Sequence, residues 1–152
     1  MKDPARRRFL AQVAAGIVLP SVTQPSAVAQ MDQLDPLVWV FTKGVPVQKG
    51  RVKLELPLLV DNGNAVPLSV TIDSPMTPDN YVKSIHLFSQ RNPVRDMARF
   101  YFTPRSGRAK VSTRVRLAGS QNVTAIVALS DGTFWADSAH ILVTLSACMD
   151  ES

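Results

Sequence analysis

The strongest constraint on the fold is a period-two alternation of apolar and polar residues that recurs between turns. In residues 110–118 the apolar set is Val111, Val115 and Leu117, together with Thr113, and charged or hydroxyl side chains occupy the positions between. Such alternation indicates a strand with one face buried. The same pattern runs through 51–60 and 66–72. Residues 122–130 are almost continuously apolar or small, which indicates a central strand covered on both faces.

Gly, Pro and Asn separate these stretches and predict where the chain turns. Asn62-Gly63 favours a tight hairpin between the strands at 51–60 and 66–72. Prolines end any strand at 74–78, and further strands are expected at 81–90, 98–103 and 141–145. About seven short strands with turns roughly every eight to twelve residues indicate an all-β fold, an immunoglobulin-like antiparallel β-sandwich. A barrel with the same number of strands is the alternative.

A short helix is expected ahead of the strands, at 34–43. Asp35 can cap it and Pro36 can start it, which places Leu37, Val40 and Phe41 on one side.

Residues 1–29 have the order of an export signal. A basic cluster at Arg6–Arg8 precedes an apolar run at 9–20, and Ala27-Val28-Ala29 predicts cleavage after Ala29. Two arginines, one spacer and Phe-Leu resemble the twin-arginine motif. The run of about twelve apolar residues is shorter than the roughly twenty that span a bilayer, so we expect no membrane anchor. The sequence therefore predicts a periplasmic protein, with one domain at 30–145 and an arm at 146–152.

The charge and cysteine content excludes several classes of function. The net charge is +5, but Lys2, Arg6, Arg7 and Arg8 against Asp3 supply +3 of it, which leaves +2. A domain so close to neutral is not expected to bind nucleic acid. The chain has one cysteine and two histidines, so neither an internal disulfide nor a structural zinc site is predicted.

Cys148 is the candidate functional residue. It lies three residues beyond Leu145, so an extended chain carries the sulfur about 10 Å from the last strand. In an exported chain, a lone cysteine must pair with another molecule, be shielded by burial, or be kept for chemistry. The nearby Asp150 and Glu151 are expected to raise the pKa of its thiol, so activation by a partner's site is predicted.

Two other uses of Cys148 are less consistent with the sequence, one as a catalytic nucleophile and one as a copper ligand. A hydrolase would need His86 or His140 as the base, with Asp137 near the second, but nothing in the sequence brings them to the arm. A blue-copper site would draw on both histidines, Cys148 and Met149, but Met149 directly follows the cysteine and no His follows it. No metal is expected.

Basic side chains concentrate around one turn and one strand. They are Arg105, Arg108, Lys110, Arg114 and Arg116. A solvated face is the favoured interpretation, and a docking face for an acidic partner is the alternative.

Several short stretches carry a resemblance to a known family. They are 52–57 (VKLELP), Asn62-Gly63, Val66-Pro67, 73–77 (DSPMT), 81–86 (YVKSIH), Asn92-Pro93, 113–117 (TRVRL), Gln121 and 130–135 (SDGTFW). In this order they resemble the SoxY family, the sulfur-carrier subunit of the bacterial thiosulfate-oxidising Sox system. The resemblance implies an immunoglobulin-like carrier that is not an enzyme, needs no cofactor and forms a heterodimer with a SoxZ-like subunit.

The resemblance also implies a role for Cys148. A c-type haem enzyme would load it with thiosulfate, and other Sox enzymes would hydrolyse off sulfate and oxidise the remaining sulfur. The family's arm is typically Gly-Gly-Cys-Gly-Gly, whereas here it reads SACMDES, which indicates a variant carrier. The alternative function is an exported binding module whose cysteine forms an intermolecular disulfide.

Overall fold

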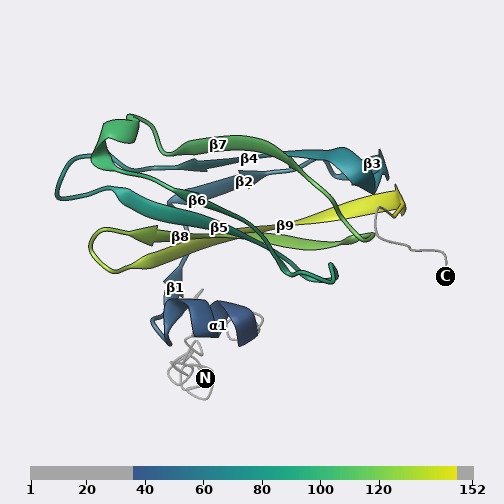
Figure 1. Cartoon of the computed structure of the whole chain (residues 1–152), viewed down its shortest axis with the longest axis horizontal. Helices are drawn as coiled ribbons and strands as arrows, with labels where there is room; N and C mark the ends of the chain where they lie inside the picture. The colour runs from purple at the N-terminus through teal and green to yellow at the C-terminus, as the bar shows by residue number, and fades with distance from the viewer. Residues whose placement is uncertain (1–35, 147–152) are drawn as a thin grey trace, which may run out of the picture.

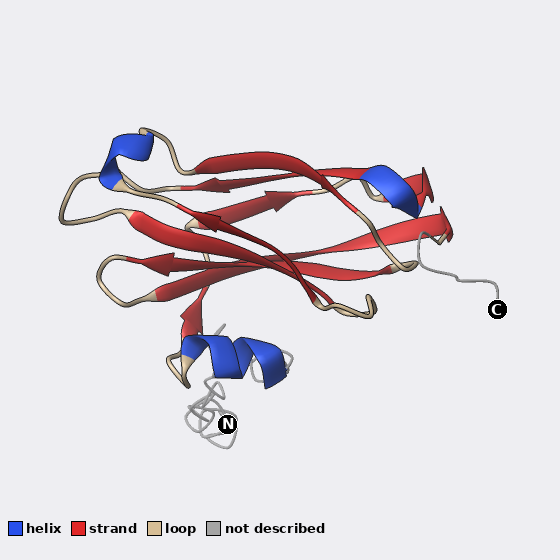
Figure 2. Cartoon of the chain, in the orientation of Figure 1, coloured by secondary structure: helices blue, strands red, loops and turns tan. Residues whose placement is uncertain are grey.

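Two β-sheets face each other, and a short helix covers the outer face of the larger one (Figures 1 and 2). This computed structural model describes residues 36–146. The helix is α1 (Pro36–Thr42). The strands are β1 (Val47–Gln48), β2 (Val52–Glu55), β3 (Leu59–Asn62), β4 (Val66–Ile72), β5 (Val82–Ser89), β6 (Asp96–Tyr101), β7 (Lys110–Val115), β8 (Gln121–Leu129) and β9 (Phe134–Leu145). The predicted all-β class with an N-terminal helix is confirmed.

The larger sheet has the order β1-β9-β8-β5-β6, with β3 also pairing β9, and the smaller sheet has the order β2-β4-β7. Strand β8 lies in the middle of the larger sheet, between β5 and β9, as its continuous apolar run predicts. The central pairs are antiparallel, but β1 and β3 both run parallel to β9. Nine strands are therefore described where about seven were predicted, because β1 was not predicted and the strand predicted at 51–60 is two strands, β2 and β3.

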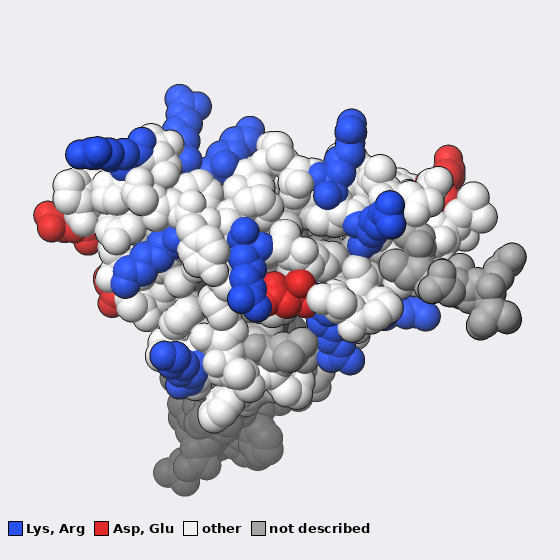
Figure 3. Space-filling view, in the orientation of Figure 1, with Lys and Arg blue, Asp and Glu red and all other residues white. Residues whose placement is uncertain are grey.

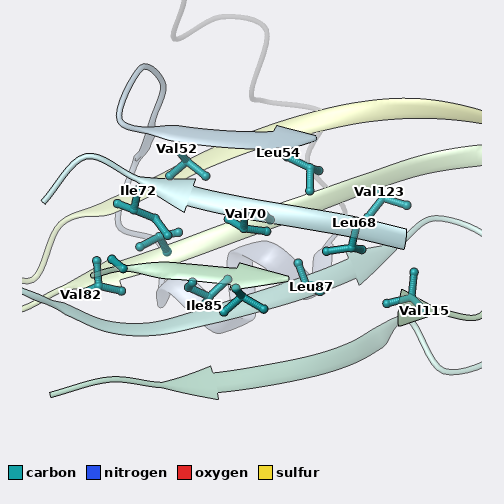
Figure 4. Packing of buried hydrophobic residues seen from close by; sticks show 14 of the residues in the cluster. Val52, Leu54, Leu68, Val70, Ile72, Val82, Ile85, Leu87, Val115 and Val123 are labelled. Atoms are coloured by element: carbon teal, nitrogen blue, oxygen red, sulfur yellow. The ribbon is translucent and has the colours of Figure 1, made fainter. Parts of the chain in front are cut away.

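Alternating side chains from both sheets form the main core (Figure 4). Val66, Leu68, Val70 and Ile72 of β4 are all buried and face Ile85 and Leu87 of β5. Burial of one such aliphatic side chain stabilises the fold by about 1.5–3 kcal/mol. The alternation in β7 behaves as expected, since Val111 and Val115 are buried in the same cluster.

A second apolar cluster lies on the outer face of the larger sheet, beneath α1. It consists of Val38, Val47, Phe88, Ile126 and Ala136, with Phe41 and Phe134 packed against them. The helix is confirmed at its predicted position, but the predicted face is wrong for Val40, which is 69% exposed, while Val38 is buried. The helix has only seven residues, and the sheet determines which side is covered.

The single strand predicted at 51–60 is wrong. The chain leaves the smaller sheet after Glu55, passes Pro57, and enters the larger sheet as β3. Proline has no N–H to donate to a ladder, which favours a break at this point. The expected tight hairpin at Asn62-Gly63 is also absent. Instead, Asn62 caps a short 3₁₀ helix (Gly63–Ala65), its side-chain oxygen accepting from the N–H of Asn64 at 2.8 Å.

The last strand is longer than predicted. It begins at Phe134, where 141–145 was expected, because its first half carries polar residues at Asp137, Ser138 and His140 that obscure the apolar pattern. The loop at 74–78 is confirmed.

Candidate functional site

The candidate site is the end of the sandwich from which the arm departs. Cys148, Met149, Asp150 and Glu151 lie outside the described residues, as do residues 1–29 and the predicted cleavage site after Ala29. Ser146, directly after β9, is the last residue that the structure describes. We call its surroundings the arm root, which comprises Arg91, Gly119, Ser120, Leu145 and Ser146.

Strand β9 is held on both sides up to the arm root. On one side, the N–H of Val143 donates to Ser120 Oγ at 2.9 Å. On the other side, Thr144 Oγ1 donates to the Asp61 carbonyl at 3.0 Å, and Leu145 pairs in register with Asn62 of β3. Cys148 therefore follows a firmly paired strand end by three residues.

A buried glutamine organises the two loops beside the arm root. Gln121 is 1% exposed, and its Oε1 accepts from the N–H of Arg91 at 2.8 Å. Its Nε2 donates to Asn92 Oδ1 at 3.0 Å and to the Gly119 carbonyl at 3.2 Å. Asn92 Nδ2 in turn donates to the Arg116 carbonyl at 2.8 Å. These bonds join the 91–92 loop to the 116–121 loop.

Gly119 allows Arg91 and Ser146 to approach each other. Its φ of +126° lies in a region that favours glycine. A Cβ on Gly119 would lie 3.2 Å from Ser146 Oγ and 3.9 Å from Arg91 Nη1. Arg91 Nη1 donates to the Ser120 carbonyl at 3.2 Å. A guanidinium is thus fixed beside the residue from which the arm departs.

Sequence reasoning did not find a role for Arg91 or Gly119. Asn92 and Gln121 were singled out only because they belong to the stretches that resemble the family. The bonds among them join residues up to 30 positions apart, and no local pattern signals such pairs.

An exposed apolar surface lies at the same end of the molecule, on β3 and β9. Leu59 and Leu142 pair in register and are both exposed. Leu58, at 82% exposure, and Leu145, at 66%, flank them. Leu59 and Leu142 thus form an apolar patch at this end of the sandwich, whereas Leu145, three residues from Leu142, points to the opposite face. Exposed apolar patches mark surfaces for protein contact.

The two histidines lie apart from each other. His86 of β5 is buried beneath α1, with its ring centroid 4.0 Å from that of Phe41. Desolvation lowers its pKa, Asp96 opposes this shift, and Arg99 adds to it. Within residues 36–146, His86 Nδ1 has no hydrogen-bond partner. His86 is therefore a core residue.

His140 is exposed on β9, and its Nδ1 lies 2.9 Å from Asn122 Oδ1. Asp137 does not orient it. Residues three apart on a strand point to opposite faces, and the Asp137 carboxylate accepts from the N–H of Leu54 instead. The pairing of His140 with Asp137 that a hydrolase would use is thus not formed. Among the described residues, no three His, Cys, Asp or Glu side chains are grouped as a metal site, and no helix is long and apolar enough to cross a membrane.

The basic side chains on and beside β7 are all exposed. Arg105, Arg108, Lys110, Arg114 and Arg116 form no ion pair with any carboxylate of residues 36–146. Figure 3 shows Lys and Arg spread over this face, with few acidic groups between them. A hollow of about 300 Å³ between β6 and β7 is lined by Asp96 on one side and by Arg114 and Arg116 on the other.

The chain matches one family model, and solved structures share its fold. A family model described as sulfur oxidation protein SoxY matches residues 39–148. No curated protein matches the sequence significantly. Among solved structures, the superoxide reductase (neelaredoxin) of Ignicoccus hospitalis is 19% identical with a TM-score of 0.56, covering 62% of this chain and 80% of that chain. The superoxide reductase of Nanoarchaeum equitans is 13% identical with a TM-score of 0.53, covering 62% of this chain and 99% of that one. At these identities the likeness shows a shared sandwich fold.

Proposed function

The chain belongs to the SoxY family of sulfur oxidation proteins, and from this premise we propose that it carries sulfur intermediates covalently on Cys148 in the periplasm. A member of this family is a carrier within the Sox system and not an enzyme.

One observation supports the attachment residue above the others. The family match extends beyond the sandwich to residue 148, and Cys148 is the one cysteine of the chain. The strand before it pairs with β8 as far as Ile141 and with β3 as far as Leu145. A carrier needs this combination of a rigid domain and a thiol beyond its edge, because visiting enzymes must enclose the cargo without unfolding the domain.

The proposed steps conserve atoms and electrons when the enzymes that the resemblance implies accept the electrons and catalyse the hydrolysis. The Cys148 thiol joins the sulfane sulfur of thiosulfate, losing one proton and passing two electrons to a c-type haem enzyme. Water then cleaves the bond between sulfane and sulfonate sulfur, which releases sulfate and one proton and leaves a persulfide on the cysteine. None of these steps needs a base from this chain, in keeping with the separation of His86 and His140 from each other.

The proposal includes a SoxZ-like subunit as a partner. The exposed leucines of β3 and β9 support a protein contact at the arm end, because they offer an apolar surface that water otherwise covers. We expect Leu59→Lys with Leu142→Lys to weaken heterodimer formation in size-exclusion chromatography. Val94→Lys, at a comparably exposed site on the loop before β6, is the matched control.

Intact-mass analysis of protein from cells grown on thiosulfate tests the attachment. We expect a thiosulfate or persulfide adduct on Cys148, lost in Cys148→Ser and retained in His140→Gln. Thermal unfolding should be the same in all three proteins. A stoichiometric disulfide-linked dimer with no sulfur adduct would overturn the proposal in favour of the exported binding module.

A further inference from the structure

Strand β7 is an edge strand of the smaller sheet with one open side. Among the described strands it pairs with β4 alone. The opposite edge strand, β2, is closed at Leu54, whose N–H donates to the Asp137 carboxylate at 2.9 Å. An edge strand with unpaired backbone groups can accept a further strand from another chain. Strand β7 is therefore the place at which the smaller sheet can be extended.

The register of β7 identifies the backbone groups on its open side. The N–H of Ile72 donates to the Ala109 carbonyl at 3.0 Å, so the hydrogen-bonded positions of this antiparallel pair fall at odd-numbered residues of β7. Pro67, which has no N–H, lies opposite Arg114 at a position without ladder bonds, as this phase requires. The N–H and C=O groups of Ser112 and Arg114 therefore point away from β4, and they have no hydrogen-bond partner within residues 36–146.

Contacts within the chain mark both ends of this open stretch. At one end, the N–H of Lys110 donates to the Arg108 carbonyl at 3.1 Å. At the other end, the carbonyl of Arg116 accepts from Asn92 Nδ2 at 2.8 Å. The backbone between these two contacts is free to bond with one short added strand.

The side chains around the open stretch are basic. Lys110 and Arg114 are exposed on the outer face of the smaller sheet, and Arg105 and Arg108 are exposed just before β7. None of these four forms an ion pair with a carboxylate of residues 36–146. A second copy of this chain is disfavoured as the added strand, because β7 paired with β7 would place like charges opposite each other. An acidic segment has the complementary charge.

The hollow between β6 and β7 lies beside the open stretch. Its volume is about 300 Å³, and Val94, Met97 and Val115 supply part of its apolar lining. Asp96 also lines it, but the carboxylate is already paired, since its Oδ2 accepts from Arg99 Nε at 2.8 Å. Successive side chains of a strand point to opposite faces. An added strand would thus direct every second side chain toward this hollow and the others toward the basic outer face.

We propose that β7 receives an extended segment of another protein in which acidic and apolar residues alternate. The segment continues the antiparallel order of the smaller sheet, and its backbone bonds to Ser112 and Arg114. Its acidic side chains lie beside Lys110 and Arg114, and its apolar side chains enter the hollow. This surface belongs to the sandwich and makes no use of Cys148, so the proposal goes beyond the proposed carrier function.

Amide hydrogen exchange of the full ¹⁵N-labelled chain tests the proposal, with a synthetic peptide of alternating Glu and Val as the probe. At saturation we expect exchange at the amides of Ser112 and Arg114 to slow by about tenfold, as a new hydrogen bond requires. The amides of Val111 and Val115 already bond to β4 and should change little. Slowing at β6 in place of these two amides, or no slowing, would overturn the proposal.

Two pairs of matched variants isolate the backbone bonds. Ser112→Pro removes the outward N–H at the open side of an edge strand, where proline is tolerated, and should prevent binding. Ser112→Ala keeps that N–H and should bind as the parent protein does. In antiparallel pairing the glutamate N–H groups of the peptide face β7, so methylation of the glutamate nitrogens should prevent binding, whereas methylation of the valine nitrogens should not. Binding of the glutamate-methylated peptide would contradict the proposal without any change to the protein.

A third comparison tests the charges. Lys110→Gln with Arg114→Gln should weaken peptide binding, by about fivefold at most for each exposed ion pair. Lys49→Gln, at an exposed cation in the loop after β1, is the matched control and should bind normally. Equal weakening in the control would mean diffuse attraction and would overturn the proposal. So would single-stranded DNA that bound at these residues when the peptide did not, since that result would indicate a nucleic-acid surface.

The proposal and the carrier function can fail separately. Cys148→Ser is expected to bind the peptide as the parent protein does. Loss of the sulfur adduct hypothesis would therefore leave the strand-addition surface standing, and absence of peptide binding would leave the carrier standing.

Discussion

The backbone N–H of Leu54 donates to the Asp137 carboxylate at 2.9 Å and so joins the smaller sheet to the larger one. Leu54 lies on β2, an edge strand, and Asp137 lies on β9. The second carboxylate oxygen accepts from the N–H of Ser138, which fixes the side chain in place. An edge N–H that would otherwise lack a strand partner thus has an acceptor, and the bond links the two sheets at this edge.

Asp137→Ala is expected to lower the free energy of unfolding by about 1–3 kcal/mol, because the Leu54 N–H loses its partner at a half-buried position. Asp137→Asn should lose less, since the amide oxygen can still accept. Urea denaturation followed by tryptophan fluorescence measures both. Equal stability of Asp137→Ala and the parent protein would contradict this assignment.

Gln121→Ala is expected to cost about 1–3 kcal/mol of unfolding free energy, because the Arg91 N–H and the Asn92 side chain lose their buried partner. The same change should broaden the amide signals of residues 91–92 and 116–120. Gln90→Ala, at an exposed glutamine one residue before Arg91, serves as the control and should change stability little. If the two variants behaved alike, Gln121 would not brace the arm root.

A comparison of Gly119→Ala with Gly132→Ala distinguishes the stability lost to backbone strain from the stability lost to a close contact with Ser146. Both glycines have positive φ, +126° and +84°, and an alanine held in such a conformation costs about 1–3 kcal/mol. A Cβ at 132 would meet nothing within 4 Å, whereas one at 119 would press on Ser146. We therefore expect the larger loss of stability, and displaced Ser146 signals, in Gly119→Ala only.

Stability should rise with pH through the range in which His86 titrates. Burial lowers the pKa of His86 in the folded protein below the usual value of about 6.5, so between the two values the unfolded chain binds more protons. The destabilisation by His86 therefore begins as the pH falls below about 6.5 and grows until the folded pKa is reached.

His86→Phe should flatten the dependence of unfolding free energy on pH below about pH 6.5, since a ring that cannot charge still fills the space against Phe41. His140→Gln removes the exposed histidine and is the matched control, in which we expect the slope to remain. A slope that vanished in His140→Gln and persisted in His86→Phe would contradict the role given to burial.

The strands could be predicted where a single face is buried. In β4 and β7 the alternation is uninterrupted, so periodicity locates the core residues. The prediction failed at 51–60, where the chain changes sheets at Pro57 although the apolar pattern continues. It also failed at Val40, because a helix of two turns has apolar residues on more than one side and only the sheet beneath decides which are covered.

The position of the candidate thiol could be read from the sequence, but its surroundings could not. Cys148 stands out because it is the one cysteine and follows the last strand. The arm root depends instead on side chains that bond to backbone groups of a distant loop, such as Asn92 to Arg116. Only the folded chain brings these together.

The pairing of β9 has a mechanical consequence for the proposed carrier, in which enzymes would engage the residues after Ser146. Strand β9 pairs with β8, which runs antiparallel to it, as far as Ile141, and with β3, which runs parallel to it, from Leu142 to Leu145. Tension applied at Ser146 along the strand would load both ladders in shear, with many hydrogen bonds resisting together rather than opening one by one. A force applied by an enzyme to the residues after Ser146 would thus be resisted by the paired strand, and the sandwich would stay folded.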